Sequence, residues 1–467
     1  MFEPFVRANL DRWQAAYEHF PGPARHVVAS ARGWLLAQVR YAPEMFQLLR
    51  NLREHETWSH DQIRAYQIRA LQMTLDLARE TVPFYRGYPR VQLRDFNDLR
   101  QLPVLRREAV RQQQEELVST AIPRSRIIRA GTTGTTGSNL RVAYTEEVAR
   151  ANWAFLLRQR EWVGVHAREP RLTLQGARII PARNAKPPFW VYNAAERQIL
   201  LSIFHLSGQT APAYIQFLRA HRNMVLEGFP SALGILAEFV LARGEPIPMR
   251  IVFTSGEPLY ASSRQAIERA FCARVFDTYG MTELCGLIQE CERGRMHLIP
   301  DYGFLEILDE NDEPCEPEEE GHLVWTGFIN SGMPLVRYRI GDRGRWLSEP
   351  ACPCGRAFPL VVPTITRESD LLRCPDGRVF SPRALNQLLK QSGSLRFCQF
   401  IHERGERVVI RAVASNGNAL EEMMSIRASL QDLLGPRMEV MAALAAEPFQ
   451  GPGGKIPLIV NQAGRNE

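Results

Sequence analysis

A loop rich in glycine and threonine spans residues 129–139, where the chain reads Arg-Ala-Gly-Thr-Thr-Gly-Thr-Thr-Gly-Ser-Asn. Glycines allow positive φ and let backbone N–H groups approach an anion closely. Threonine hydroxyls can donate to phosphate oxygens and can ligate Mg²⁺. The loop lacks the Gly-Lys-Ser/Thr ending of the P-loop NTPases, which argues against that class. Taken alone, the pattern is equally typical of a phosphate-binding loop and of a surface turn.

Three cysteines and one histidine form a second candidate site. Cys291 and His297 are followed, well apart in the sequence, by the pair Cys352 and Cys354. Three thiolates and one imidazole are a fitting tetrahedral set for Zn²⁺, and four closed protein ligands indicate a structural role. The two halves meet only if the segment between them folds back. Cys285 is an alternative ligand, and the other interpretation is a group of unrelated buried thiols.

Short apolar runs alternate with helical patterns from about residue 125 onward. Runs at 126–129, 224–227 and 250–254 each precede a loop that contains glycine, proline or serine. This alternation indicates an α/β architecture with ligand-binding loops at the strand ends.

Other parts of the chain follow different patterns. Residues 1–90 read as a helical cap, residues 303–346 as a small sheet, and the residues after about 366 as mixed strands and helices. The predicted fold is therefore α/β, with a large N-terminal domain of layered sheets and helices that includes a small β-rich subdomain. A small mobile α+β C-terminal domain completes it. We place the two domains at 1–366 and 367–467.

The composition limits the classes of function. The chain has 467 residues, a net charge of +6 and scattered arginines, which argue against nucleic-acid binding. No run reaches the roughly 18 apolar residues of a transmembrane segment, and Met1–Arg7 does not read as a secretory signal. Dispersed cysteines indicate a reducing compartment, so we expect a cytoplasmic protein.

Four further motifs follow the glycine loop in order: Ser255-Gly256-Glu257, Tyr279-Gly280-Met281-Thr282-Glu283, Arg337-Tyr338-Arg339-Ile340-Gly341-Asp342 and Gly453-Gly454-Lys455. In this order they resemble the adenylate-forming superfamily of acyl-CoA synthetases, in particular its phenylacetate-CoA ligase/CapK-like branch. The resemblance runs from about Trp58 to Lys455. Each motif alone is weak evidence, since the second is also typical of a strand end followed by a helix N-cap at Thr282. Five ordered motifs are far more specific.

The resemblance implies that the glycine loop binds the phosphates of ATP. The family's loop corresponds to Thr133, Gly134, Thr135, Thr136 and Gly137. The repeated Gly-Thr-Thr also allows a register shifted by three residues. Arg367 corresponds to an arginine near the domain hinge that reaches the nucleotide. Ser369 stands where relatives usually have a hinge carboxylate, which leaves the domain rotation open.

Two of the later motifs imply contacts with the adenine. By resemblance, Gly256 and Glu257 lie beside the base and Tyr279 stacks on it, as a flat aromatic ring can. Ser255 and Gly280 belong to the same nucleotide-binding set.

The remaining implied roles concern catalysis. Thr282 would contact the α-phosphate, Glu283 would hold Mg²⁺ through a hard carboxylate oxygen, and Asp342 would accept hydrogen bonds from both ribose hydroxyls. Lys455 corresponds to a lysine on a C-terminal glycine loop that enters the active site. Its ammonium would neutralise charge that builds on the α-phosphate and pyrophosphate.

The expected function follows from the resemblance: ATP-dependent activation of a carboxylic acid as an acyl-adenylate, then transfer to the thiol of coenzyme A. The expected cofactors are ATP, Mg²⁺, coenzyme A and a structural Zn²⁺. An aryl acid is expected from the resemblance alone. The alternatives are transfer to an amine or a carrier-protein thiol, and a non-catalytic nucleotide-binding partner in polysaccharide or secondary-metabolite assembly. A homodimer is a further possibility that the sequence leaves open.

Overall fold

The computed structural model describes residues 17, 20–131, 140–176, 179–181, 184–348, 351–364, 371–380, 382–389, 394–403, 406–414, 418–447 and 458–462. Among the described helices, none is both long and apolar enough to cross a membrane.

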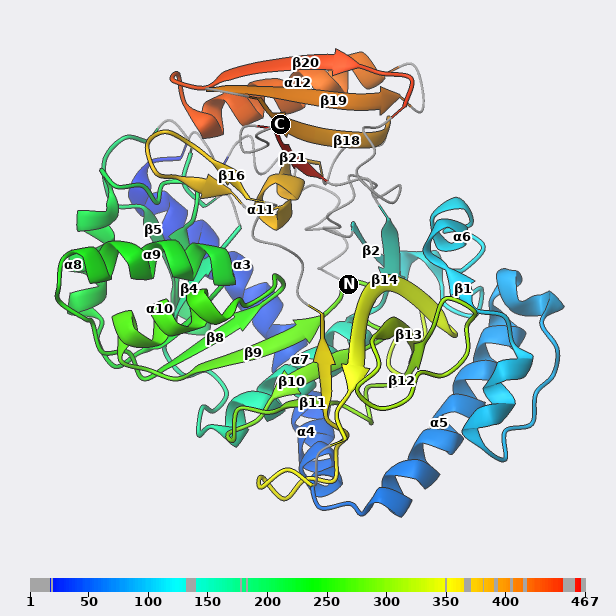
Figure 1. Cartoon of the computed structure of the whole chain (residues 1–467). Coiled ribbons are helices and arrows are strands. Elements are labelled where there is room, and N and C mark those ends of the chain that lie inside the picture. The colour runs from blue at the N-terminus through cyan, green and yellow to red at the C-terminus, as the bar shows by residue number, and fades with distance from the viewer. Residues whose placement is uncertain are drawn as a thin grey trace.

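An eight-stranded sheet lies at the centre of the larger part of the molecule, in the order β11-β10-β9-β8-β7-β4-β6-β5 (Figure 1). The five strands from β9 to β6 run parallel, and β5, β10 and β11 are antiparallel to their neighbours. The strands are β4 (Arg171–Gln175), β5 (Trp190–Asn193), β6 (Gln198–Ser202), β7 (Val225–Gly228), β8 (Ile251–Ser255), β9 (Val275–Gly280), β10 (Leu287–Glu290) and β11 (Met296–Leu298).

Helices cover both faces of this sheet, because the side chains of its strands are apolar on both. Val252 packs in the core formed with the helices that follow β6, β7 and β8, while Phe253, the next residue, packs in a separate cluster on the opposite face. The helices are α7 (Glu146–Trp162), α8 (Ala211–Ala220), α9 (Pro230–Ala242) and α10 (Ala261–Phe271).

Within the described residues 20–81, three helices precede the sheets, in agreement with the helical pattern predicted there. They are α3 (Gly22–Arg40), α4 (Pro43–His55) and α5 (His60–Thr81). Helix α3 packs on β5 and α4 packs on α7. Ser59 caps α5 in a reciprocal capping box with Gln62, which explains why this helix begins where it does.

A smaller sheet, in the order β1-β14-β13-β12 with β15 paired to β14, forms the predicted β-rich region. Its strands are β1 (Leu105–Arg106), β12 (Gly303–Leu308), β13 (Gly321–Gly327), β14 (Tyr338–Trp346) and β15 (Val361–Pro363). Helix α6 (Arg107–Gln112) follows β1, and the hairpin of β2 (Ile128–Gly131) and β3 (Arg141–Tyr144) flanks the glycine loop.

The C-terminal part forms a separate α+β layer, at the top of Figure 1, around a four-stranded sheet in the order β20-β19-β18-β21. Its elements are β16 (Leu372–Arg373), β17 (Val379–Phe380), α11 (Pro382–Asn386), β18 (Leu395–His402), β19 (Arg407–Ala414), α12 (Ala419–Leu434), β20 (Glu439–Leu444) and β21 (Ile459–Asn461). Phe204, after β6, joins the core of this layer and stacks on Phe380. The predicted α/β fold class, with a β-rich subdomain and a small α+β C-terminal region, is confirmed. The boundary at 366/367 stays a prediction.

Candidate functional site

The loops after β8 and β9 carry several of the predicted site residues, and they lie together because the carboxyl ends of parallel strands share one edge of a sheet. After β8 the chain turns at Gly256, whose φ of +83° favours glycine. Glu257 Oε2 accepts a hydrogen bond of 3.2 Å from the Ser231 backbone N–H at the start of α9. Ser255, Gly256 and Glu257 are therefore grouped at this edge, each half-buried.

Tyr279 and Asp342 bring two distant motifs into contact. The Tyr279 hydroxyl, at the end of β9, donates to Asp342 Oδ2 on β14 at 2.7 Å. The Tyr279 ring stacks on Trp325 of β13 with 6.5 Å between ring centroids. Burial raises the pKa of Tyr279 well above its usual value, and the Asp342 carboxylate raises it further. The hydroxyl therefore stays protonated as a donor, and Asp342 itself is exposed beside it.

The segment after Gly280 turns back directly into β10. Leu284 has a φ of +55° in this turn, and no helix follows. The interpretation of Thr282 as a helix N-cap is therefore wrong. Thr282 is half-buried, while Glu283 is buried at the base of the smaller sheet's β14.

Glu283 lies among residues that sequence reasoning did not single out. Its Oε1 accepts a hydrogen bond of 3.2 Å from the Tyr338 hydroxyl. Burial raises the pKa of the Glu283 carboxyl, although the positive charge of Arg107 opposes this rise. Tyr338 stands inside the Arg-Tyr-Arg motif, so the sequence did offer a signal that this residue lies near the site. Arg107 stands far upstream in no recognised pattern, and only the structure brings it near.

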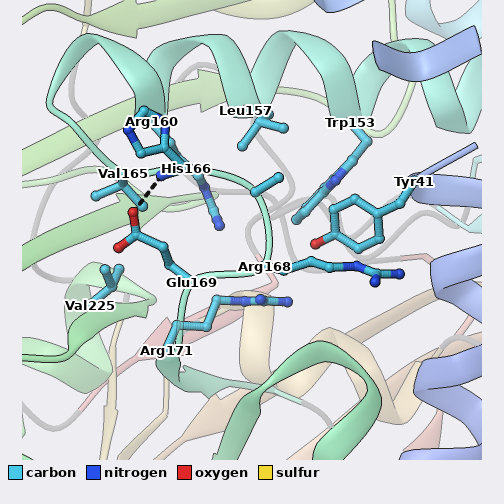
Figure 2. A pocket seen from close by; sticks show the side chains of 11 residues that line it. Tyr41, Trp153, Leu157, Arg160, Val165, His166, Arg168, Glu169, Arg171 and Val225 are labelled. Carbon is cyan, nitrogen blue, oxygen red and sulfur yellow. Dashed lines mark hydrogen bonds between the residues drawn. The ribbon is translucent and has the colours of Figure 1, made fainter. Parts of the chain in front are cut away.

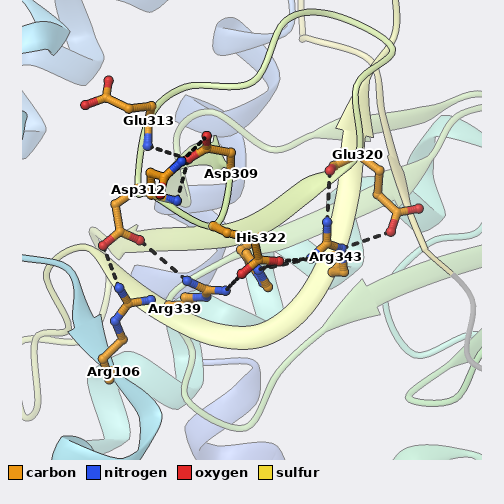
Figure 3. A network of polar contacts seen from close by, with 10 residues as sticks. Arg106, Asp309, Asp312, Glu313, Glu320, His322, Arg339 and Arg343 are labelled. Carbon is orange, nitrogen blue, oxygen red and sulfur yellow. Dashed lines mark hydrogen bonds and ion pairs between the residues drawn. The ribbon is translucent and has the colours of Figure 1, made fainter. Parts of the chain in front are cut away.

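A network of charged side chains connects β14 with β13 and with the turn that follows β12 (Figure 3). Glu310 contacts Arg339 at 3.0 Å, Arg343 at 2.8 Å and His322 at 2.9 Å. Exposed pairs of this kind contribute little stability each. Because Arg339 and Arg343 lie on either side of Asp342 on β14, these contacts help to position the strand that carries Asp342.

The four predicted metal ligands do come together. Among the described residues, Cys291, His297, Cys352 and Cys354 form a group whose ligand atoms all lie within 4.8 Å of one another. The hairpin of β10 and β11 supplies the first two, and pairing of His297 with Leu360 brings the second half alongside. All of these cysteines are free thiols.

The spacing of these atoms fits a tetrahedral Zn²⁺ site. Zinc–sulfur bonds of about 2.3 Å and zinc–nitrogen bonds of about 2.0 Å at tetrahedral angles separate ligand atoms by about 3.5–3.8 Å. The Sγ atoms of Cys291 and Cys352 lie 3.8 Å apart, and Cys354 Sγ lies 3.5 Å from His297 Nε2. His297 Nδ1 contacts the Phe358 carbonyl at 2.8 Å, which leaves Nε2 for a metal.

Cys285 is not part of this group. Its Sγ lies 3.2 Å from the sulfur of Met281, and it is buried in the same hydrophobic core as Leu305 and Trp325 of the smaller sheet. The alternative ligand set with Cys285 is therefore not supported by the structure.

Several predicted site residues lie outside the described residues. They are Thr133, Gly134, Thr135, Thr136 and Gly137 of the glycine loop, Arg367 with Ser369 at the predicted hinge, and Lys455. Their assigned roles stay predictions.

A cluster of buried charges, the α7 charge cluster, lies beneath α7 and consists of Arg160, Arg171, Glu196 and Glu227. Glu227 contacts Arg160 at 2.5 Å and Arg171 at 3.2 Å, and Arg171 contacts Glu196 at 2.7 Å. Burial raises the pKa of Glu227, but the two arginines outweigh it and lower this pKa to about 2. Figure 2 shows Arg160 and Arg171 at the edge of a pocket that Tyr41 also lines, and its volume of about 10 Å³ is room for about one water. The cluster is structural, and sequence reasoning missed it because its members are scattered along the chain.

The fold and the carboxyl-edge loops are similar to those of the adenylate-forming enzymes. The family described as "AMP-binding enzyme" matches residues 199–331, which include β7, β8, β9 and the loops that follow them. A solved structure of 2-hydroxyisobutyryl-CoA ligase, in complex with 2-HIB-AMP and CoA, is similar in fold, with a TM-score of 0.56 at 19% identity. The alignment covers 88% of this chain and 92% of that one.

Curated relatives show which branch of these enzymes the chain resembles. Protein CapK of Staphylococcus aureus is 22% identical over 412 residues, covering 86% of this chain and 88% of its own. The phenylacetate-coenzyme A ligase of Thermus thermophilus is 23% identical over 459 residues, covering 87% and 98%. That of Escherichia coli is 26% identical over 352 residues, covering 72% and 78%. The resemblance to the phenylacetate-CoA ligase/CapK-like branch, and with it the prediction of an adenylate-forming ligase, is confirmed.

Proposed function

We propose that the protein activates a carboxylic acid with ATP and Mg²⁺ and transfers the acyl group to coenzyme A. The observation that carries the proposal is the 2.7 Å hydrogen bond between Tyr279 and Asp342, which joins two ordered motifs at the carboxyl edge of the sheet. The match to the AMP-binding family over residues 199–331 supports the nucleotide. The relatives that are phenylacetate-coenzyme A ligases support coenzyme A and an aryl acid.

In the first half-reaction, a carboxylate oxygen of the acid attacks the α-phosphorus of ATP. The bond from the α-phosphorus to the bridging oxygen breaks, and pyrophosphate leaves with its electron pair. The acid arrives ionised, so no general base is required. Thr282 would hold the α-phosphate, and the Glu283 carboxylate would be a hard oxygen ligand for Mg²⁺, which neutralises phosphate charge when bound.

The nucleotide itself would be oriented by the exposed Asp342 carboxylate, which has lone pairs left for ribose hydroxyls while it accepts from Tyr279. Ser255, Gly256 and Glu257 would border the adenine, with Tyr279 and Gly280 opposite. The glycine loop, Thr133–Gly137, would bind the β- and γ-phosphates, and Arg367 would reach the nucleotide from the hinge.

In the second half-reaction, the coenzyme A thiolate attacks the acyl carbon, the bond from that carbon to the phosphate oxygen breaks, and AMP leaves. We assign residues 367–467 as a lid whose Lys455 serves the first step and withdraws for the second. Ser369 stands where relatives usually have a hinge carboxylate. Activity of this chain in both half-reactions would therefore show that the rotation does not require that carboxylate.

The Cys₃His group is assigned to a structural Zn²⁺ that clamps the β10–β11 hairpin to the segment around Cys352. The protein is expected to act in the cytoplasm, where thiols stay reduced. Cys352→Ser should lose about one equivalent of zinc in metal analysis. Cys374→Ser is the matched control, since Cys374 is equally buried but lies outside the group. Equal zinc content in both variants would contradict the assignment.

Product analysis tests the transfer step. The protein would be incubated with ATP, Mg²⁺, coenzyme A and a panel of aryl and aliphatic acids, and products would be measured by mass spectrometry. An acyl-CoA and AMP formed from an aryl acid would support the proposal. If the acyl group passes only to an amine or a carrier-protein thiol, that group and not coenzyme A is the acceptor. Tight ATP binding without turnover of any acid would indicate a non-catalytic partner.

A further inference from the structure

A second cavity, of about 210 Å³, lies between the start of α3 and the segment that joins β4 to β5. Its polar lining residues are Arg25, His26, Asn184 and Lys186. None of the described residues that line it is an aspartate or glutamate. The described lining of the cavity is therefore positive.

Among the residues that the structure describes, no carboxylate balances the positive charge of Arg25. Its exposed fraction is only 7%, and its Nε is buried without a hydrogen-bond partner. Nor does its guanidinium form an ion pair with any residue that the structure describes. A buried cation without a partner is costly, so buried guanidinium groups are normally paired. Arg25 also lies in the first turn of α3, which has no acidic residue and no side-chain cap, so the helix dipole adds to its positive charge.

His26 and Lys186 add two further donors. The Tyr192 backbone N–H donates to His26 Nδ1 at 3.0 Å, so the proton of the neutral ring lies on Nε2, which can donate. Lys186 is exposed and forms no ion pair within the described ranges. It is one of only three lysines in the chain, with Lys390 and Lys455.

We propose that this cavity binds a phosphate group. Two cations, an imidazole N–H and a helix N-terminus converge from two separate elements, which suits a multiply charged tetrahedral anion better than a single carboxylate. The cavity borders β5, four strands from β8 in the sheet order, or about 19 Å away at 4.8 Å per strand. It is therefore separate from the proposed ATP site and does not depend on the proposed acid activation. Its phosphate could belong to a free inorganic ion or to a phosphorylated nucleoside.

Lysine footprinting tests the proposal at the site itself. The full-length protein would be acetylated with an N-hydroxysuccinimide ester, and the rates at Lys186 and Lys390 would be measured by peptide mass spectrometry. The probes are inorganic phosphate, pyrophosphate and adenosine 3′,5′-bisphosphate, with sodium chloride and acetate at equal ionic strength as controls. We expect a phosphate-bearing probe at tenfold its dissociation constant to slow acetylation of Lys186 about tenfold relative to chloride, with Lys390 unchanged. Protection by the bisphosphate alone would assign a nucleoside source, and protection by the inorganic ions a free one.

Arg25→Gln should abolish the protection of Lys186, while Arg222→Gln, an exposed arginine that precedes β7, should retain it. Because the change removes an unpaired buried cation, the melting temperature of Arg25→Gln without phosphate should equal or exceed that of the wild type. Asn184→Leu, at a half-buried lining position, gives an independent variant that should also weaken protection. The proposal is overturned if acetate protects as well as phosphate, if no probe exceeds chloride, or if protection survives in Arg25→Gln.

Discussion

The α7 charge cluster and the carboxyl edge of the same sheet both contain buried carboxylates, yet the two regions treat them differently. In the cluster, Glu227 is contacted by two arginines and by the Thr173 hydroxyl at 2.6 Å. At the carboxyl edge, Glu283 and Asp342 each accept from a tyrosine hydroxyl, and neither forms an ion pair with a described residue. The pKa follows the same division, lowered to about 2 for Glu227 and raised for Glu283.

This difference teaches how to separate stabilising charges from binding charges in one fold. A buried carboxylate that is held by two arginines cannot be removed without loss of stability, because its partners are then left as buried charges. A buried carboxylate with spare lone pairs and a raised pKa costs stability, and such groups are concentrated at functional sites. Each prediction below changes one residue in the α7 charge cluster or at the carboxyl edge. Its outcome can contradict the division into stabilising and binding charges.

Glu283→Gln should give the largest effect at the carboxyl edge. Because the variant removes the proposed Mg²⁺ ligand, we expect the rate of acyl-adenylate formation to fall about 10²–10³-fold. The free energy of unfolding should stay equal or rise, since an unpaired buried carboxylate is removed. Steady-state kinetics and urea unfolding measure the two quantities. A stability loss with intact activity would reverse the assignment.

Glu227→Gln is the matched change in the α7 charge cluster. Removing Glu227 leaves Arg160 without an ion-pair partner among the described residues and Arg171 with Glu196 alone, so the free energy of unfolding should fall by about 3 kcal/mol. The rate per folded molecule should stay within about twofold of the wild type, because the cluster touches no predicted site residue. Loss of activity without loss of stability would contradict the structural role.

The pH dependence of this stability difference follows from the lowered pKa of Glu227. A carboxylate with a lowered pKa contributes its stability above the unfolded-state pKa of about 4.3 and loses it as pH falls through the folded value of about 2. The difference between wild type and Glu227→Gln should therefore be constant from pH 5 to pH 7 and shrink by about 3 kcal/mol toward pH 2. Unfolding measured across this range checks it, and a difference independent of pH would show that the Glu227 charge is not responsible.

Tyr279→Phe should give the smallest effect. The change deletes the hydroxyl that orients Asp342 but retains the ring, so we expect the KM for ATP to rise about five- to tenfold, equivalent to about 1 kcal/mol. The KM for the acid should not change. Equal rises in both would show that the hydroxyl supports the fold of the site and not the nucleotide contact.

The sequence was sufficient where local residue types carry the chemistry. The order of the motifs singled out Tyr279, Glu283 and Asp342, and the Cys/His spacing singled out the four residues whose ligand atoms the structure brings together. It was insufficient where long-range packing decides. The alternative interpretation of Thr282 as a helix N-cap is wrong because β10 pairs back onto β9 at once, through a turn. Arg107 reaches Glu283 only because α6 follows β1, which pairs with β14.

Acid-dependent exchange of pyrophosphate into ATP is the most direct test of the central claim that this site forms an acyl-adenylate. The wild type should exchange label only with a suitable acid and Mg²⁺ present. Lys455→Ala and Asp342→Ala should each reduce exchange by about a hundredfold or more, since both act on the charged transition state or its nucleotide. Exchange that survives both substitutions would contradict the account.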